Sequence, residues 1–157
     1  MILNNASFII QWIILYSLKD NIGGYTFKQV LLLWGLAALT YGFSHFFCEE
    51  AYNLSDTINT GKLDNYLLQP KNVLLSVITS KVSISAIGDI LYAYIILFFY
   101  GISLNTILIY TFFGITGAII ITSIAIITGS LAFWFGRVEM LSNTINSLMN
   151  SFSTYPE

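Results

Sequence analysis

Four residues able to bind a metal or move a proton lie close together in the sequence. They follow a long apolar run and are His45, Cys48, Glu49 and Glu50. Imidazole, thiolate and carboxylate are the groups that bind zinc, but the spacing of these residues does not match the zinc motifs. Because polarity resumes where a membrane span ends, we expect them at the end of a span, with ligand or proton binding as the alternative.

The tripeptide Thr60-Gly61-Lys62 is similar to the last residues of a phosphate-binding loop. Such a loop needs a glycine five positions before Gly61 and a serine or threonine after Lys62, where this chain has Asp56 and Leu63. The sequence therefore predicts no ATPase site of its own. With one histidine and one cysteine in the whole chain, we also expect no catalytic residue, no cofactor site and no metal site.

A single acidic residue, Asp89, lies at the start of a third apolar run. A carboxylate near the N-terminus of a helix complements the helix dipole, and there it can remain near headgroup water. In the alternative interpretation Asp89 is buried and couples the polar segment before it to the membrane helices, with Lys81, about two turns earlier, as its partner. The sequence leaves both interpretations open.

Membrane spans are the elements that must position these residues. Of 157 residues, 56% are hydrophobic and 9% are charged, whereas soluble domains carry about 25% charged residues. Apolar runs near the length of a bilayer-crossing helix recur along the chain. We predict an all-α integral membrane helical bundle with about four transmembrane helices, over about residues 1–18, 27–47, 87–104 and 107–135.

The polar segment over about residues 48–84 carries most of the charged residues. Its apolar residues recur at helical spacing, Gly61 and Pro70 interrupt the pattern, and Asn72 can cap a further helix. We therefore expect short amphipathic helices. The basic residues of this segment and the tail outnumber those of the other loops, which places the segment in the cytoplasm; the two sets are Lys62, Lys71, Lys81 and Arg137, against Lys19 and Lys28.

Small residues recur along one side of two predicted spans. They are Gly35, Ala38 and Gly42 in the second span, and Gly114, Ala118 and Thr122 in the fourth. Because small side chains let helix backbones approach closely, we expect these faces to pack inside the bundle. After Arg137 the apolar residues return on one helical face, which indicates an interfacial or re-entrant helix.

The stretch from Gly61 to Asn72 reads GKLDNYLLQPKN. It resembles the aGxLDxxLlxPxn segment of bacterial permeases in the type-2 ATP-binding-cassette (ABC) exporter superfamily. Further matches extend the resemblance to nearly all of the chain; they are Gly42-Phe43-Ser44-His45, Gly88-Asp89, Ser130-Leu131-Ala132-Phe133-Trp134 and Tyr155-Pro156. Compared with that family, we expect the chain to lack the basic N-terminal helix with the start of the first span, and to stop before two further spans. We expect residues 1–157 to form one partial permease domain.

The resemblance implies a membrane subunit of which two copies pair with two cytosolic ATPase subunits to export a substrate across the plasma membrane. ATP hydrolysis would belong to the partner, so the chain itself would not be an enzyme. The resemblance also implies that six residues face the ATPase, namely Gly61, Lys62, Leu63, Asp64, Gln69 and Pro70.

The alternatives are an autonomous small membrane channel or structural membrane protein, and a non-functional permease fragment. Six scattered basic residues and a net charge of -2 provide no continuous cationic surface, so nucleic acid is not an expected partner. No motif identifies the substrate.

Overall fold

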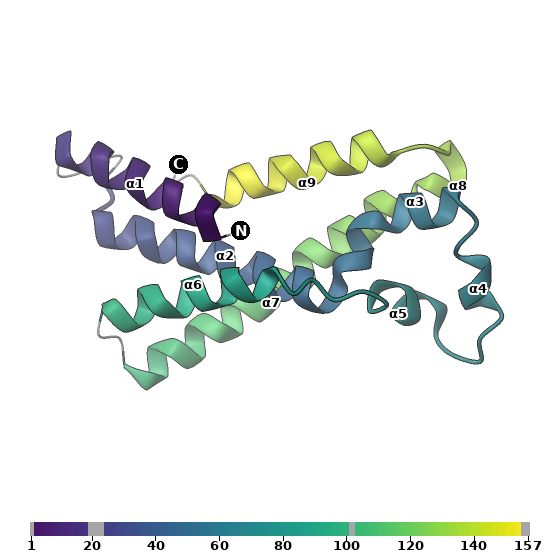
Figure 1. Ribbon diagram of the computed structural model, residues 1–157, viewed down its shortest axis with the longest axis horizontal. Coiled ribbons are helices and arrows are strands. Elements are labelled where there is room, and N and C mark those ends of the chain that lie inside the picture. Colours follow the sequence, from purple (N-terminus) through teal and green to yellow (C-terminus); the bar gives the residue numbers. More distant parts are fainter. Residues whose placement is uncertain (1, 19–23, 101–102, 155–157) are drawn as a thin grey trace.

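The computed structural model describes residues 2–18, 24–100 and 103–154, and helices make up most of them (Figure 1). Lys19, Tyr155-Pro156, the first residue of the first predicted span and residues 101–102 of the third predicted span lie outside these residues. The elements in chain order are α1 (Ile2–Leu18), α2 (Phe27–Cys48), the 3-10 helix η1 (Glu49–Asn53), α3 (Leu54–Asn59), α4 (Asp64–Leu67), α5 (Val73–Ile78), α6 (Ala86–Phe99), α7 (Leu104–Ser130), α8 (Ala132–Phe135) and α9 (Glu139–Thr154).

Within the described residues, two continuous helical stretches are long and apolar enough to cross a membrane. Phe27–Asn59 joins α2, η1 and α3, and Leu104–Phe135 joins α7 and α8; Ile9–Leu18 and α6 are shorter apolar helices. Large apolar side chains such as Phe98 (84% exposed) and Phe112 (63% exposed) face outward from α6 and α7. Apolar residues over the outer surface suit contact with lipid tails. These features confirm the predicted helical membrane bundle.

Helix α2 packs against both α6 and α7 and forms the centre of the bundle. A Cβ atom added at Gly42 would lie 2.7 Å from Ile90 Cγ1 and 3.3 Å from the Ala86 carbonyl oxygen of α6. At Gly114 of α7, an added Cβ would lie 2.7 Å from Leu39 Cδ2 of α2. The small-residue faces predicted from the sequence therefore pack inside the bundle, because a Cβ at Gly42 would crowd the backbone of α6 and a Cβ at Gly114 would require the Leu39 side chain to shift.

The N-terminal helix α1 lies along one side of this centre (Figure 1). Its buried Trp12 packs against Val30 and Trp34 of α2, with Tyr16 and Phe27 at the edge of the cluster. The Tyr16 hydroxyl donates a hydrogen bond to the Tyr25 carbonyl oxygen at 2.8 Å. Aromatic packing and this bond hold α1 against the start of α2.

The last helix, α9, returns from α8 along α7 and also packs against α2 (Figure 1). A polar residue, Ser142, is its most buried member at 2% exposure, and the Ser142 Oγ lies 3.3 Å from Thr128 Oγ1 of α7. Its apolar residues Leu148 and Phe152 are exposed. Helix α9 thus turns a hydroxyl toward the bundle and apolar side chains outward. The interfacial or re-entrant placement of α9 stays a prediction.

Candidate functional site

The long helix that begins at Phe27 changes its winding at Cys48. Cys48 has φ -136° and ψ 39°, and the chain then continues as the 3-10 helix η1 before α3. Close to this change, the Ser83 N–H donates a hydrogen bond to the His45 carbonyl oxygen at 3.3 Å. A 3-10 stretch inside a long helix is a recurrent feature of hinges. Because Ser83 bonds to His45, the linker between α5 and α6, residues 79–85, lies against the point at Cys48 where this helix changes its winding. We call this point the break.

Glu50 lies immediately after the break and is buried, with 5% exposure. The Thr57 hydroxyl donates a hydrogen bond to Glu50 Oε1 at 2.8 Å, and Lys81 Nζ lies 2.6 Å from Glu50 Oε2. A carboxylate buried without a partner is costly, so these two contacts are what permit the burial. The contact with the Glu50 carboxylate raises the pKa of Lys81 above 10.5.

Glu50 belongs to the group of residues expected at the end of the second span, and there its carboxylate is buried. Thr57 and Lys81 supply the contacts that water would supply to an exposed carboxylate. His45 and Glu49 do form a pair, with His45 Nδ1 at 2.7 Å from Glu49 Oε2. Among the described residues, no three or more His, Cys, Asp and Glu side chains lie together as metal ligands would.

Asp89 occupies the first turn of α6, the position predicted from the sequence. It is 7% exposed, so the chain itself covers the carboxylate, as in the interpretation that makes it a buried residue. The partner suggested for it, Lys81, instead contacts Glu50. Sequence spacing could not distinguish Glu50 from Asp89 as the partner of Lys81, because both carboxylates lie near the same linker.

A chain of polar contacts joins the region of the break to α7. The buried Ser44 Oγ lies 2.6 Å from the Tyr52 hydroxyl of η1 and 2.7 Å from Thr122 Oγ1 of α7. The His45 ring stacks on the Tyr52 ring, with 4.1 Å between the ring centroids. These contacts fix α2, η1 and α7 to one another. Thr122 belongs to the small-residue face predicted for this helix, but the spacing of that face carries no signal for its hydrogen bond.

The six predicted ATPase-facing residues lie on and around α4, which projects from the bundle (Figure 1). All are exposed except the half-buried Leu63. Gly61 follows α3 with φ +73°, a conformation that favours glycine, and so it sets the turn toward α4. Lys62 Nζ lies 3.1 Å from Asp56 Oδ2, and both side chains are about half exposed. This segment therefore offers an exposed, charged surface held in a defined shape.

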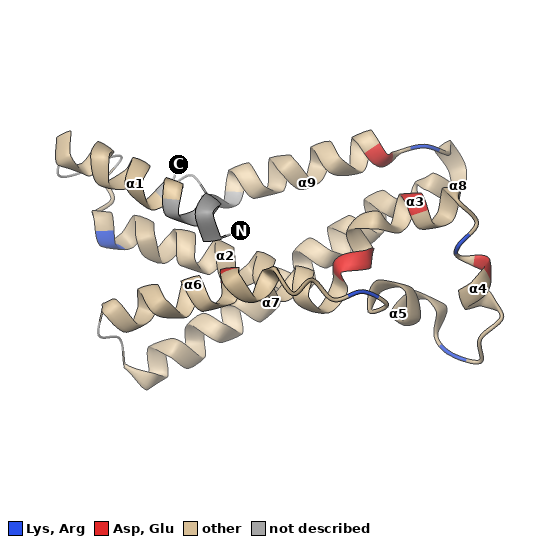
Figure 2. Cartoon of the chain, in the orientation of Figure 1, with Lys and Arg blue, Asp and Glu red and all other residues tan. Residues whose placement is uncertain are grey.

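Most of the basic residues in the described part of the chain lie at one end of the molecule. Figure 2 shows the basic residues between α3 and α6, and between α8 and α9, at the end where α3, α4, α5 and α8 lie. These residues are Lys62, Lys71, Lys81 and Arg137. Lys28, the second residue of α2, lies at the opposite end (Figure 2), with its Nζ 5.1 Å from the centre of the Tyr100 ring. The fold thus gathers the four basic residues that the sequence analysis assigned to one side.

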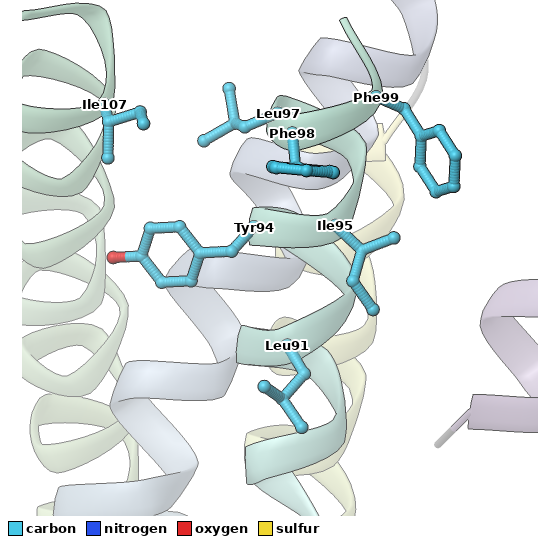
Figure 3. Close-up of a pocket in the computed structure, with 7 residues that line it drawn as sticks. All are labelled: Leu91, Tyr94, Ile95, Leu97, Phe98, Phe99 and Ile107. Atoms are coloured by element: carbon cyan, nitrogen blue, oxygen red, sulfur yellow. The ribbon is translucent and has the colours of Figure 1, made fainter. Parts of the chain in front are cut away.

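A groove of about 740 Å³ lies along α6 and the start of α7 (Figure 3). None of the described residues that line it is charged, and the Tyr94 hydroxyl is paired with Thr111 Oγ1 at 2.9 Å. The lining residues are Leu91, Tyr94, Ile95, Leu97, Phe98, Phe99 and Ile107. The groove can accept apolar groups, but it presents neither a nucleophile nor a general base.

Comparison with protein families gives a match to the ABC-2 family transporter proteins over residues 2–157. Comparison with curated proteins and with solved structures gives no match.

Proposed function

Because the chain belongs to the ABC-2 family of transporter proteins, we propose that it is the membrane permease subunit of an export-type ABC transporter. The family match supports a transport role and association with an ABC ATPase, which would carry out ATP hydrolysis. In this proposal, movements of the ATPase pass through residues 48–84 into the bundle. The substrate then crosses the plasma membrane outward.

The observation that carries this proposal is the connection between the exposed α4 region and the membrane helices. Gly61, Lys62 and Asp64 are exposed at the tip of the segment. From there the chain leads through α5 to Lys81, which contacts Glu50 at the break in the long helix. A stiff segment built of short helices can transmit a push that a flexible loop would absorb. Residues 48–84 therefore suit a coupling role.

The orientation and the assembly also belong to the proposal. The four basic residues at one end favour a cytoplasmic location for that end, because Lys and Arg are enriched in cytoplasmic loops. A second permease copy, identical or related, would complete the membrane part of the transporter. Within this arrangement, residues 1–157 form a transmembrane permease domain, and Asp89, buried in the first turn of α6 just after the coupling segment, is a residue that would couple this segment to the bundle.

Co-purification tests the proposed ATPase contact. We expect the tagged chain, extracted from its native membrane, to bring down an ABC ATPase identified by mass spectrometry. Lys62→Glu and Asp64→Lys should each reduce its recovery, because they reverse charges on the exposed surface around α4. Lys28→Glu is the matched control, since it reverses a charge at the opposite end of the molecule.

Three results would contradict the proposal or its details. Recovery unchanged by both variants would rule out the α4 region as the contact. An equal loss with Lys28→Glu would show a general effect of charge instead of a local one. Recovery of the chain with no ABC ATPase, together with ion conductance by the purified chain, would support an autonomous channel.

A further inference from the structure

We propose that Lys81 and Glu50 form a latch, which holds the linker between α5 and α6 against the break in the long helix at Cys48. The latch is closed in this structure, with 2.6 Å between Lys81 Nζ and Glu50 Oε2. Its opening would let the coupling segment move relative to α2 and α6. The role of the latch in transport rests on the proposed function, whereas its effect on the linker can be measured on this chain alone.

The two partners of the latch differ sharply in exposure. The Glu50 side chain is 6% exposed, and its other oxygen is held by Thr57, itself 1% exposed. The Lys81 side chain is 61% exposed. The carboxylate is therefore anchored within the fold, while the ammonium reaches it from a segment open to water. When the latch opens, Lys81 is the partner that moves away.

The elements on either side show where movement can occur. Immediately after the linker, α6 is packed tightly against α2, because a Cβ at Gly42 would lie 3.2 Å from the Ile90 nitrogen and 3.3 Å from the Ala86 oxygen. Within the linker, the Ser83 N–H bond to the His45 carbonyl oxygen is long, at 3.3 Å. The start of α6 is thus fixed, and the stronger restraint on the linker is the charged contact of Lys81.

An ion pair with one buried partner favours two distinct states over a gradual loosening. Once Lys81 leaves, Glu50 keeps its bond to Thr57 but has lost its neutralising charge inside the fold. At an intermediate separation, the Glu50 carboxylate and the Lys81 ammonium would neither be in contact nor be fully hydrated. The Lys62–Asp56 pair in the same segment lacks this property, because its side chains are 59% and 48% exposed.

Hydrogen–deuterium exchange on the full chain in phospholipid nanodiscs tests the latch. We expect Lys81→Met to speed exchange of the linker amides, Ser83 included, and of η1 by about tenfold, with the central turns of α6 and α7 unchanged. Lys81→Arg keeps the positive charge, so its amides should exchange at nearly the rate of the unmodified chain. Lys62→Met is the matched control, since it also removes a lysine from an ion pair in this segment, and it should leave these amides unchanged.

A double variant separates a direct contact from a general loosening. Glu50→Gln keeps an oxygen that can accept from Thr57 and removes the charge that Lys81 contacts. If the two residues act through each other, the double variant Glu50→Gln, Lys81→Met should exchange its linker amides only slightly faster than Glu50→Gln alone. Unchanged exchange in Lys81→Met, an equal rise in Lys62→Met, or fully additive effects would each overturn the latch. Because no ATPase is present in this assay, its outcome is independent of the co-purification result.

Discussion

Replacement of Gly42 by alanine tests the packing at the centre of the bundle. The added Cβ would lie 2.7 Å from Ile90 Cγ1, 3.2 Å from the Ile90 nitrogen and 3.3 Å from the Ala86 oxygen. A side-chain methylene can rotate away, but the two backbone atoms belong to α6 itself. Gly42→Ala must therefore push α6 away from α2 or distort one of these helices.

The expected loss of stability follows from two opposing terms. Overpacking a well-packed site costs about 1–3 kcal/mol, whereas alanine gains up to about 1 kcal/mol over glycine inside a helix. The net effect should be a destabilisation of about 1–2 kcal/mol. Since about 1.4 kcal/mol corresponds to a factor of ten, the ratio of folded to unfolded chain should fall roughly tenfold.

Unfolding in mixed micelles by titration with sodium dodecyl sulfate, followed by circular dichroism, measures this change. Ser123→Ala is the control, because Ser123 is exposed on α7 and its hydroxyl bonds only within its own helix, to the Ile119 carbonyl oxygen at 2.7 Å. It should change the free energy of unfolding by less than about 0.5 kcal/mol. A Gly42→Ala chain as stable as the unmodified chain would refute the close approach of α2 and α6.

Three further predictions follow from the polar contacts and the turn. Ser44→Ala removes hydroxyl contacts to Tyr52 and Thr122 and should cost about 1 kcal/mol in the same titration; no loss would contradict the network. Gly61→Ala forces alanine to φ +73° and should cost about 1–2 kcal/mol, seen as faster proteolysis between α3 and α4; unchanged cleavage would argue against that turn. Because Glu50 raises the pKa of Lys81 above 10.5, their pairing should stabilise the linker fully below pH 10.5 and be lost as the pH rises through the raised pKa. Linker exchange, corrected for the intrinsic pH dependence of amide exchange, should rise there in the unmodified chain but not in Lys81→Met.

Local features of the fold could be predicted from the sequence. The Asn72 side chain accepts a hydrogen bond from the Leu75 N–H at 3.2 Å, as expected for the residue before α5. Gly61 follows α3 with a positive φ, as expected for a residue that ends a helix. Both outcomes depend on residues only a few positions apart. For the same reason the small-residue faces were found, since helical periodicity alone defines them.

The contacts that build the candidate site depend on tertiary structure. Ser44 and Thr122 lie 78 positions apart and meet only because α2 and α7 pack closely. Glu50 faces inward where the helix changes its winding at Cys48. The residue types in that stretch do not predict such a change. A regular helix through this point would have turned Glu50 to another side. The partner of Lys81 therefore could not be read from spacing, which suggested Asp89.

The proposal that a cytoplasmic coupling segment is joined to membrane-spanning helices is tested most directly by finding the side of the membrane to which each end of the molecule is exposed. In a Cys48→Ser background, Lys71→Cys and Lys28→Cys place single thiols at the two ends separated in Figure 2. A membrane-impermeant maleimide should label Lys71→Cys only from the cytoplasmic side and Lys28→Cys only from the outside. Labelling of both from one side, or of Lys71→Cys from the outside, would contradict a cytoplasmic coupling segment joined to membrane-spanning helices.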